Sequence, residues 1–291
     1  MFRPARRVSW GTRIFALLVF LVAVGAIGAF LEVLLPQQVA KLAEMEGNEL
    51  VQARKGTADV NTAVAGLWAD LAPKGSMTLS ADRMTEDLAL AKRTERSADD
   101  ALSHVQAAEA YMAQADGLPF QFHSPSFIAT DRAAAQHLEK ALTTSIKLSH
   151  AATLQLTIAG HMSQNSQSLV SVNASLNARD WTNAARTALT IATDLKSQQI
   201  PAGDPEALLD PLWAKWVDAM LGVAIDAQQY SLASAANQTQ QAQQAGRTLA
   251  AARDQLAASF AAAQNGAGAW QAKTVQPVLD SIARETTASG A

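Results

Sequence analysis

The strongest pattern in the chain is an apolar run over residues 14–35, IFALLVFLVAVGAIGAFLEVLL, whose single charge is Glu32. At ~1.5 Å per residue this run would extend roughly 33 Å as a helix, which matches the hydrocarbon core of a bilayer. The pattern predicts an N-terminal transmembrane helix. Two other interpretations stay open: a cleaved signal peptide, whose apolar region is typically ~7–15 residues long, and a buried helix of a soluble protein.

After this run, apolar residues recur at helical intervals, with polar residues between them. Residues 36–58 contain Gly47 and Gly56, and glycine weakens a helix, so this segment is expected to be a stalk-like helix of low stability. A firmer helix is expected over residues 59–71. The next, over about 80–115, has a stripe with the heptad-like spacing of a coiled coil: Leu88, Ala91, Ala98, Leu102, Val105 and Met112.

Turn and capping residues indicate where the later helices begin and end. A third helix is expected from near Ser126 or Thr130 to about Asn177, and a fourth from Asp180 to a point before Pro201. The linker 198–205 contains two prolines and a glycine and is the best candidate for a sub-domain boundary. Beyond it, the glutamine- and alanine-rich residues 236–245 fit either one very long helix or two helices in series.

The sequence Asn265-Gly-Ala-Gly268 is expected to break this helical region before a short amphipathic piece and a frayed tail. Alternation of apolar and polar residues never persists, so no strand is predicted. The fold class is therefore all-α, with one N-terminal transmembrane helix and an elongated antiparallel bundle of about five to six helices. The predicted segments are 1–13 (basic, cytoplasmic), 14–35 (transmembrane anchor), 36–58 (stalk-like helix), 59–199 (first part of the bundle), 200–264 (second part of the bundle) and 265–291 (short helix and tail).

The distribution of charge predicts an orientation. Residues 1–13 carry four arginines and no acid, whereas the remaining residues carry 19 basic and 26 acidic side chains. The positive-inside rule then places the N-terminus in the cytoplasm and the bulk of the chain outside it. Since the body is mildly acidic, nucleic acid is not an expected partner. The sequence contains no cysteine, which excludes disulfides and thiolate metal sites.

Few residues stand out as candidate contacts for a partner or ligand. An aromatic loop over residues 116–127 could be either a protruding recognition loop or a hydrophobic cap on the end of the bundle. Three tryptophans could form either a binding hot spot for a partner or part of the hydrophobic core. His150 and His161 would lie about 16 Å apart on one helix, too far for a shared metal ion, and His104 and His137 lie on different helices. The candidate contacts are Phe120, Phe122, His123, Phe127, Trp181, Trp213 and Trp216.

No phosphate-binding loop, nucleotide-binding glycine motif or nucleophile elbow occurs in the sequence, so neither an enzyme nor a bound cofactor is predicted. The expected function is that of a single-pass, membrane-anchored, extracytoplasmic module for protein interaction or scaffolding. Its expected partners are the bilayer and a protein, with a homodimer through the span suggested by Gly25 and Ala29. The alternatives are a ligand-sensing bundle that works with a separate signalling protein and, less favoured, a hydrolase with a site at His123.

Overall fold

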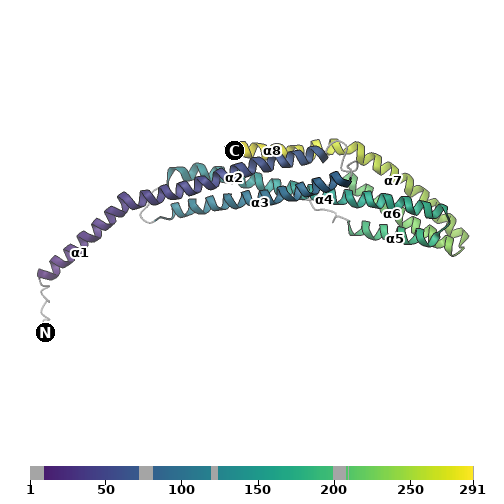
Figure 1. Ribbon diagram of the computed structural model, residues 1–291, viewed down its shortest axis with the longest axis horizontal. Helices are drawn as coiled ribbons and strands as arrows, with labels where there is room; N and C mark the ends of the chain where they lie inside the picture. Colours follow the sequence, from purple (N-terminus) through teal and green to yellow (C-terminus); the bar gives the residue numbers. More distant parts are fainter. Residues whose placement is uncertain (1–9, 72–80, 119–123, 199–207, 209, 291) are drawn as a thin grey trace, which may run out of the picture.

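The computed structural model describes residues 10–71, 81–118, 124–198, 208 and 210–290 (Figure 1). All of its elements are helices, and no strand occurs in these ranges, which confirms the all-α prediction. The elements are α1 (Trp10–Ala29), η1 (Phe30–Leu34), α2 (Leu35–Leu71), α3 (Ala81–Asp116), α4 (Ser126–Asn177), α5 (Trp181–Ser197), α6 (Pro211–Ala235), α7 (Thr239–Thr274) and α8 (Gln276–Ala288).

The apolar N-terminal helix leads without a break into the body of the molecule. Helix α1 continues through η1, a single π-helical stretch, into α2. Pro36 explains this irregularity, since proline has no N–H for the carbonyl of Glu32 and crowds it, so the helix widens just before the proline. Within the described ranges this is the one helix long and apolar enough to cross a membrane, and its apolar part is not buried by the rest of the protein.

A first core is formed by α2, α3, the N-terminal half of α4 and α8. Helices α2 and α3 run antiparallel, because Glu49 lies beside His104 and Asp70 lies beside Arg83. The C-terminal end of the chain returns to α2, where the Arg54 Nε donates a hydrogen bond of 3.0 Å to the carbonyl of Ser289. Figure 1 shows α8 lying along α2, with the C-terminus pointing back toward α1.

A second core is formed by the C-terminal half of α4 together with α5, α6 and α7. Helices α6 and α7 form an antiparallel hairpin, held near its base by the rings of Trp216 and Phe260, whose centroids are 5.5 Å apart. The first core extends along α4 to Leu156, and the second begins at Ile158. Helix α4 therefore joins the two cores end to end, which gives the elongated shape seen in Figure 1.

Several predicted helix limits agree with the structure. The helix expected over about 80–115 is α3, and the third expected helix is α4, at Ser126–Asn177. Asp180 caps α5 by accepting a hydrogen bond from the backbone N–H of Asn183 at 3.2 Å. The glutamine-rich region is two helices in series, separated by a turn at residues 236–238.

Three expectations for glycine-containing and terminal segments need correction. Asn265-Gly-Ala-Gly268 does not break a helix, because α7 runs through it to Thr274, and a side chain at Gly266 would collide with Leu212. The tail is not frayed from residue 286, because α8 continues to Ala288 and both Thr286 and Ser289 are buried. The expected stalk is part of the first core from Glu46 onward, where α2 packs against α3.

Gly56 was expected to weaken the helix, but it lies at the point where α2 and α3 cross closely. A Cβ atom added to Gly56 would lie 2.7 Å from the Cβ of Ala101 on α3, whereas one added to Gly47 would meet nothing within 4 Å. We expect Gly56→Ala to lower the free energy of unfolding by about 1–3 kcal/mol, since α2 and α3 must move apart. Gly47→Ala on the same helix should raise it by up to about 1 kcal/mol, because alanine favours the helix. Urea denaturation of both variants measures the difference, and equal effects would contradict the crossing.

Candidate functional site

The predicted contact residues fall in three different places. Phe120, Phe122 and His123 lie outside the described residues. Phe127, at the start of α4, is half-buried and packs against the first core. Trp181, at the start of α5, is half-buried and meets Tyr230 edge-on, with ring centroids 5.8 Å apart.

The other two tryptophans lie together inside the second core. Trp213 and Trp216 are 0% and 5% exposed, and their rings meet edge-on with centroids 6.0 Å apart. Trp181 is not part of this cluster, because it packs on Tyr230 at the far end of α6, about five turns from Trp213. The burial of Trp213 and Trp216 fits the core role that their helical spacing also allowed.

Among the residues that the structure describes, three histidines pair with carboxylates across helix interfaces. His104 on α3 contacts Glu49 on α2 at 2.5 Å, and His137 on α4 contacts Glu285 on α8 at 2.6 Å. Glu285 also pairs with Lys140, and these hydrogen bonds from Lys140 and His137 lower the pKa of its carboxyl group. His104 and His137 therefore bind separate acids rather than each other, and both pairs tie neighbouring helices together.

The third pair borders a groove. His161 on α4 contacts both carboxylate oxygens of Asp194 on α5 through its Nδ1, at 3.1 Å, and Asn165 Nδ2 donates to Asp194 at 2.7 Å. Because Nδ1 is engaged, the Nε2 on the other side of the ring is the nitrogen that can bind a ligand. The groove runs between α3 and α4 and is lined by Met84, Thr85, Leu88, Leu156, Thr157, Gly160, His161, Ser163, Gln164 and Gln167.

This groove has a mixed lining in which polar residues outnumber apolar ones, so it would suit a small polar molecule. It combines methionine and leucine side chains with hydroxyls, amides and one oriented imidazole. Sequence reasoning considered His161 but missed its partners. A signal was available for Asn165 alone, since His161 and Asn165 are four residues apart and so share one helix face, whereas Asp194 lies on another helix. No cluster of three or more metal-ligating side chains occurs among the described residues.

Three acidic side chains in the described part of the chain are buried, which composition alone could not reveal. Burial raises the pKa of Asp87 and of Asp210, and Asp210 caps α6 by accepting a hydrogen bond of 2.9 Å from the N–H of Leu212. Glu46 on α2 lies outside the apolar segment 14–35, and its Oε1 has no hydrogen-bond partner. Burial, reinforced by Asp131, raises the pKa of Glu46 to about 7.

The raised pKa of Glu46 predicts a pH dependence of stability. Between its ordinary value of 4.5 and about 7, the folded protein holds a proton that the unfolded chain releases. The protonated form of Glu46 therefore stabilises the folded protein at acidic pH, and this stabilisation is lost as the pH rises through 7. We expect Glu46→Gln to have a higher Tm than the parent at pH 8 and a similar Tm at pH 5. Glu44→Gln, at an exposed position of the same helix, is the control; a pH-independent difference for Glu46→Gln would contradict the assignment.

Comparison of the chain with known protein families, with curated proteins and with solved structures finds no match. The case for a function therefore rests on the apolar N-terminal helix, the groove beside His161 and the surfaces of the helical body.

Proposed function

We propose that this protein is a single-pass, membrane-anchored scaffold whose helical bundle lies outside the cytoplasm and engages a protein partner. The observation that carries the proposal is the unburied apolar helix α1 and its continuity with α2. An apolar helix that the body leaves uncovered needs another apolar environment, and a bilayer supplies one. Because α2 belongs to the first core, the body is held by a helix rather than by a flexible linker.

The shape of the body supports a role as a rigid spacer. Helix α4 alone has 52 residues, or about 78 Å at ~1.5 Å per residue, more than twice the ~30 Å hydrocarbon core of a membrane. The turn between α6 and α7 lies at the end of the molecule opposite α1 (Figure 1). The four arginines before the apolar run favour a cytoplasmic N-terminus, so this hairpin would be presented far from the outer membrane face.

Anchoring is tested on the full chain by alkaline carbonate extraction of membranes, followed by the intact mass of the extracted protein. We expect the protein to stay in the membrane pellet with residues 14–35 present in the measured mass. Release into the supernatant, or a mass that lacks the N-terminal segment, would show a peripheral or secreted protein and contradict the proposal.

The groove beside His161 favours a second candidate function, the sensing of a small ligand by the bundle with a separate signalling protein. The oriented imidazole and the neighbouring hydroxyl and amide groups offer several hydrogen bonds to one small polar molecule. A library of small metabolites is screened for a rise in Tm of the full chain in detergent. A ligand of this groove should lose its effect in His161→Ala and keep it in His150→Ala, since His150 is an exposed residue of the same helix. Equal effects in both variants would rule out the groove.

A further inference from the structure

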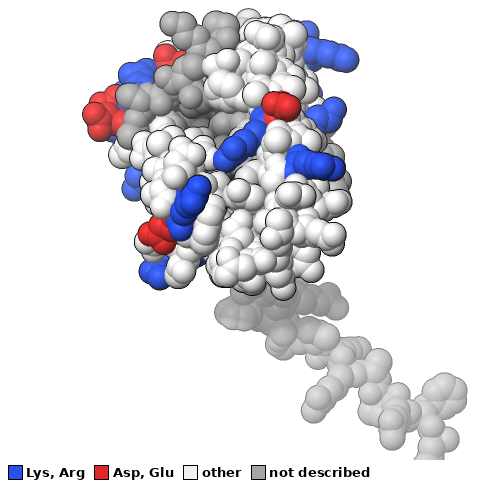
Figure 2. All heavy atoms as spheres, turned by 90° about the vertical axis from the view of Figure 1, so that its right-hand side faces the viewer, with Lys and Arg blue, Asp and Glu red and all other residues white. Residues whose placement is uncertain are grey.

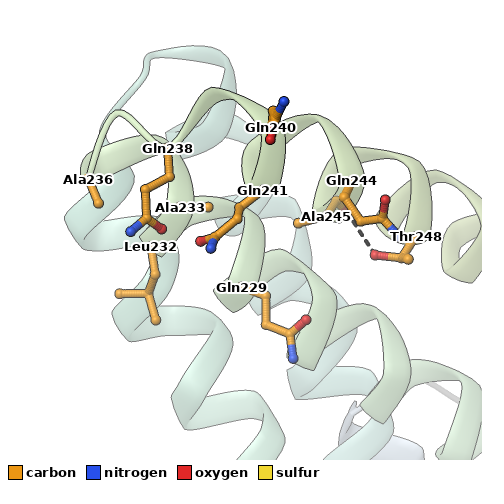
Figure 3. A pocket seen from close by; sticks show the side chains of 10 residues that line it. All are labelled: Gln229, Leu232, Ala233, Ala236, Gln238, Gln240, Gln241, Gln244, Ala245 and Thr248. Carbon is orange, nitrogen blue, oxygen red and sulfur yellow. Dashed lines mark hydrogen bonds between the residues drawn. The ribbon is translucent and has the colours of Figure 1, made fainter.

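The outer side of the α6–α7 hairpin carries an exposed surface that none of the described helices covers. Figure 3 shows amide side chains from both helices around a shallow groove with alanine at its base. The residues recur at intervals of three and four along each helix, so they form one continuous face. We call this surface the glutamine face; it consists of Gln229, Leu232, Ala233, Ala236, Gln238, Gln240, Gln241, Gln244, Ala245 and Thr248.

Most of the glutamine face is exposed, including an aliphatic side chain. Leu232 is 54% exposed, and only Ala233 and Ala245 of the face are buried. Helix α7 packs mainly on α6, while α5 covers a different side of α6, where Trp181 meets Tyr230. Over its first four turns or so, α7 buries only Ala245 and Leu249. A helical hairpin that packs against the rest of the protein on one side only can accept a further helix on its uncovered side.

The glutamine face also lacks charge, in contrast to the rest of the body. From Ala227 to Gly246 the sequence has no acidic or basic residue, and Asp226 and Arg247 flank this segment. The end-on view in Figure 2 shows charged side chains separated by broad uncharged areas at this end of the molecule. Depletion of charge marks the centres of protein interfaces, because a charge buried there would lose its hydration.

The chemistry of the face favours a second copy of the same chain as its occupant. A carboxylate only accepts hydrogen bonds and an ammonium only donates them, so identical charged faces repel each other. A glutamine amide both donates and accepts, so two identical amide faces can satisfy each other. The small side chains of Ala233, Ala236 and Ala245 let helices approach closely, and Leu232 supplies apolar area.

Membrane anchoring would favour the same occupant. This step rests on the proposed function, since copies anchored in one membrane stand parallel, with their glutamine faces at the same height. A two-fold axis along the molecule then brings each face against its equivalent, as closed dimers require. Confinement to the membrane also raises the effective concentration of the second copy.

We propose that the glutamine face is a self-association surface, through which two membrane-anchored copies pair side by side along their α6–α7 hairpins. The pairing would involve the membrane-distal part of the molecule. It is separate from any contact between the spans at Gly25 and Ala29.

The absence of cysteine from the sequence allows a clean test by cross-linking in membranes. Gln241→Cys places a thiol on the glutamine face, and Gln243→Cys places one about 200° around the same helix, where it borders a different groove. With a short bis-maleimide, we expect Gln241→Cys to form a covalent dimer and Gln243→Cys to remain monomeric. Equal yields for the two variants, or a Gln241→Cys product with another protein only, would overturn the proposal.

Charge substitutions in the full chain provide the second test. Gln241→Glu and Gln241→Lys are each expected to reduce dimer yield about tenfold, measured with a cysteine at Gln244 in every variant, because like charges would face each other. Co-expression of the two variants should restore the yield as a mixed dimer. Both positions are exposed, so neither change should prevent folding. Unchanged yields in the single variants, or no recovery in the mixture, would overturn the proposal.

The two proposals fail separately in these experiments. Loss of the dimer in a protein that still resists carbonate extraction would reject the glutamine face alone. A dimer that forms through Gln241→Cys in protein released by carbonate would keep the glutamine face and reject membrane anchoring.

Discussion

Replacing Trp213 by alanine is expected to lower the free energy of unfolding by about 3–5 kcal/mol, the largest effect of any single substitution considered. Its indole ring is 0% exposed in the second core and stacks edge-on against Trp216. Truncation would leave a cavity between α6 and its neighbours, which close-packed helices fill only in part. Chemical denaturation followed by circular dichroism measures the loss.

Trp181→Ala is the matched control for this substitution. Trp181 is only half-buried and has an edge-on partner in Tyr230, so its loss should cost about 1–2 kcal/mol. If Trp181→Ala destabilised the protein as much as Trp213→Ala, the second core would not be centred on Trp213 and Trp216. That result would also favour the interpretation that Trp181, Trp213 and Trp216 belong to one extended binding surface.

Introducing two arginines into the apolar helix, as Leu18→Arg with Val22→Arg, is expected to abolish membrane retention. Both residues are more than half exposed on α1 and are four residues apart, so they share one face. Each arginine near the centre of a membrane helix costs roughly 2.5–3.5 kcal/mol on insertion scales, in addition to the lost apolar contact. The fraction of protein in the carbonate-resistant pellet measures retention, which should fall from nearly all to a minor part.

The control makes the same number of arginine substitutions in the helical body, as Val51→Arg with Val170→Arg. These valines are 58% and 68% exposed but lie on α2 and α4, beyond the apolar run. The control protein should stay in the membrane pellet and keep its Tm. Retention of the α1 variant at the level of the control would mean that α1 does not anchor the protein.

Local sequence signals predicted most of the helices because each signal acts within a few residues. The carboxylate of Asp180 accepts a hydrogen bond from the N–H of Asn183 at the start of α5, and the stripe that includes Val105 and Met112 defines the buried side of α3. The corrections concern glycines, whose effect depends on distant neighbours. Gly56 and Gly266 reduce helix propensity locally, yet both lie within helices. Helix α3 passes close to Gly56 at Ala101, and the end of the Leu212 side chain occupies the space beside Gly266.

The candidate sites were harder to predict than the helices, because they combine residues far apart in sequence. His161 and Asp194, or Arg54 and Ser289, come together only once the order of helix packing is known. The raised pKa of Glu46 likewise depends on tertiary burial and on Asp131 of α4, so the residues around Glu46 in the sequence do not indicate it. The glutamine-rich composition was visible in the sequence, but its arrangement as one uncovered face required the α6–α7 hairpin.

The central claim, that α1 tethers a helical body on the side of the membrane away from the arginines, is tested most directly by thiol accessibility. Two single-cysteine variants of the full chain are exposed to a membrane-impermeant maleimide in intact cells: Gln255→Cys, exposed on α7, and Ser9→Cys, before the apolar run. We predict labelling of Gln255→Cys in intact cells and of Ser9→Cys only after lysis. Labelling of Ser9→Cys in intact cells, or protection of Gln255→Cys until lysis, would contradict the account.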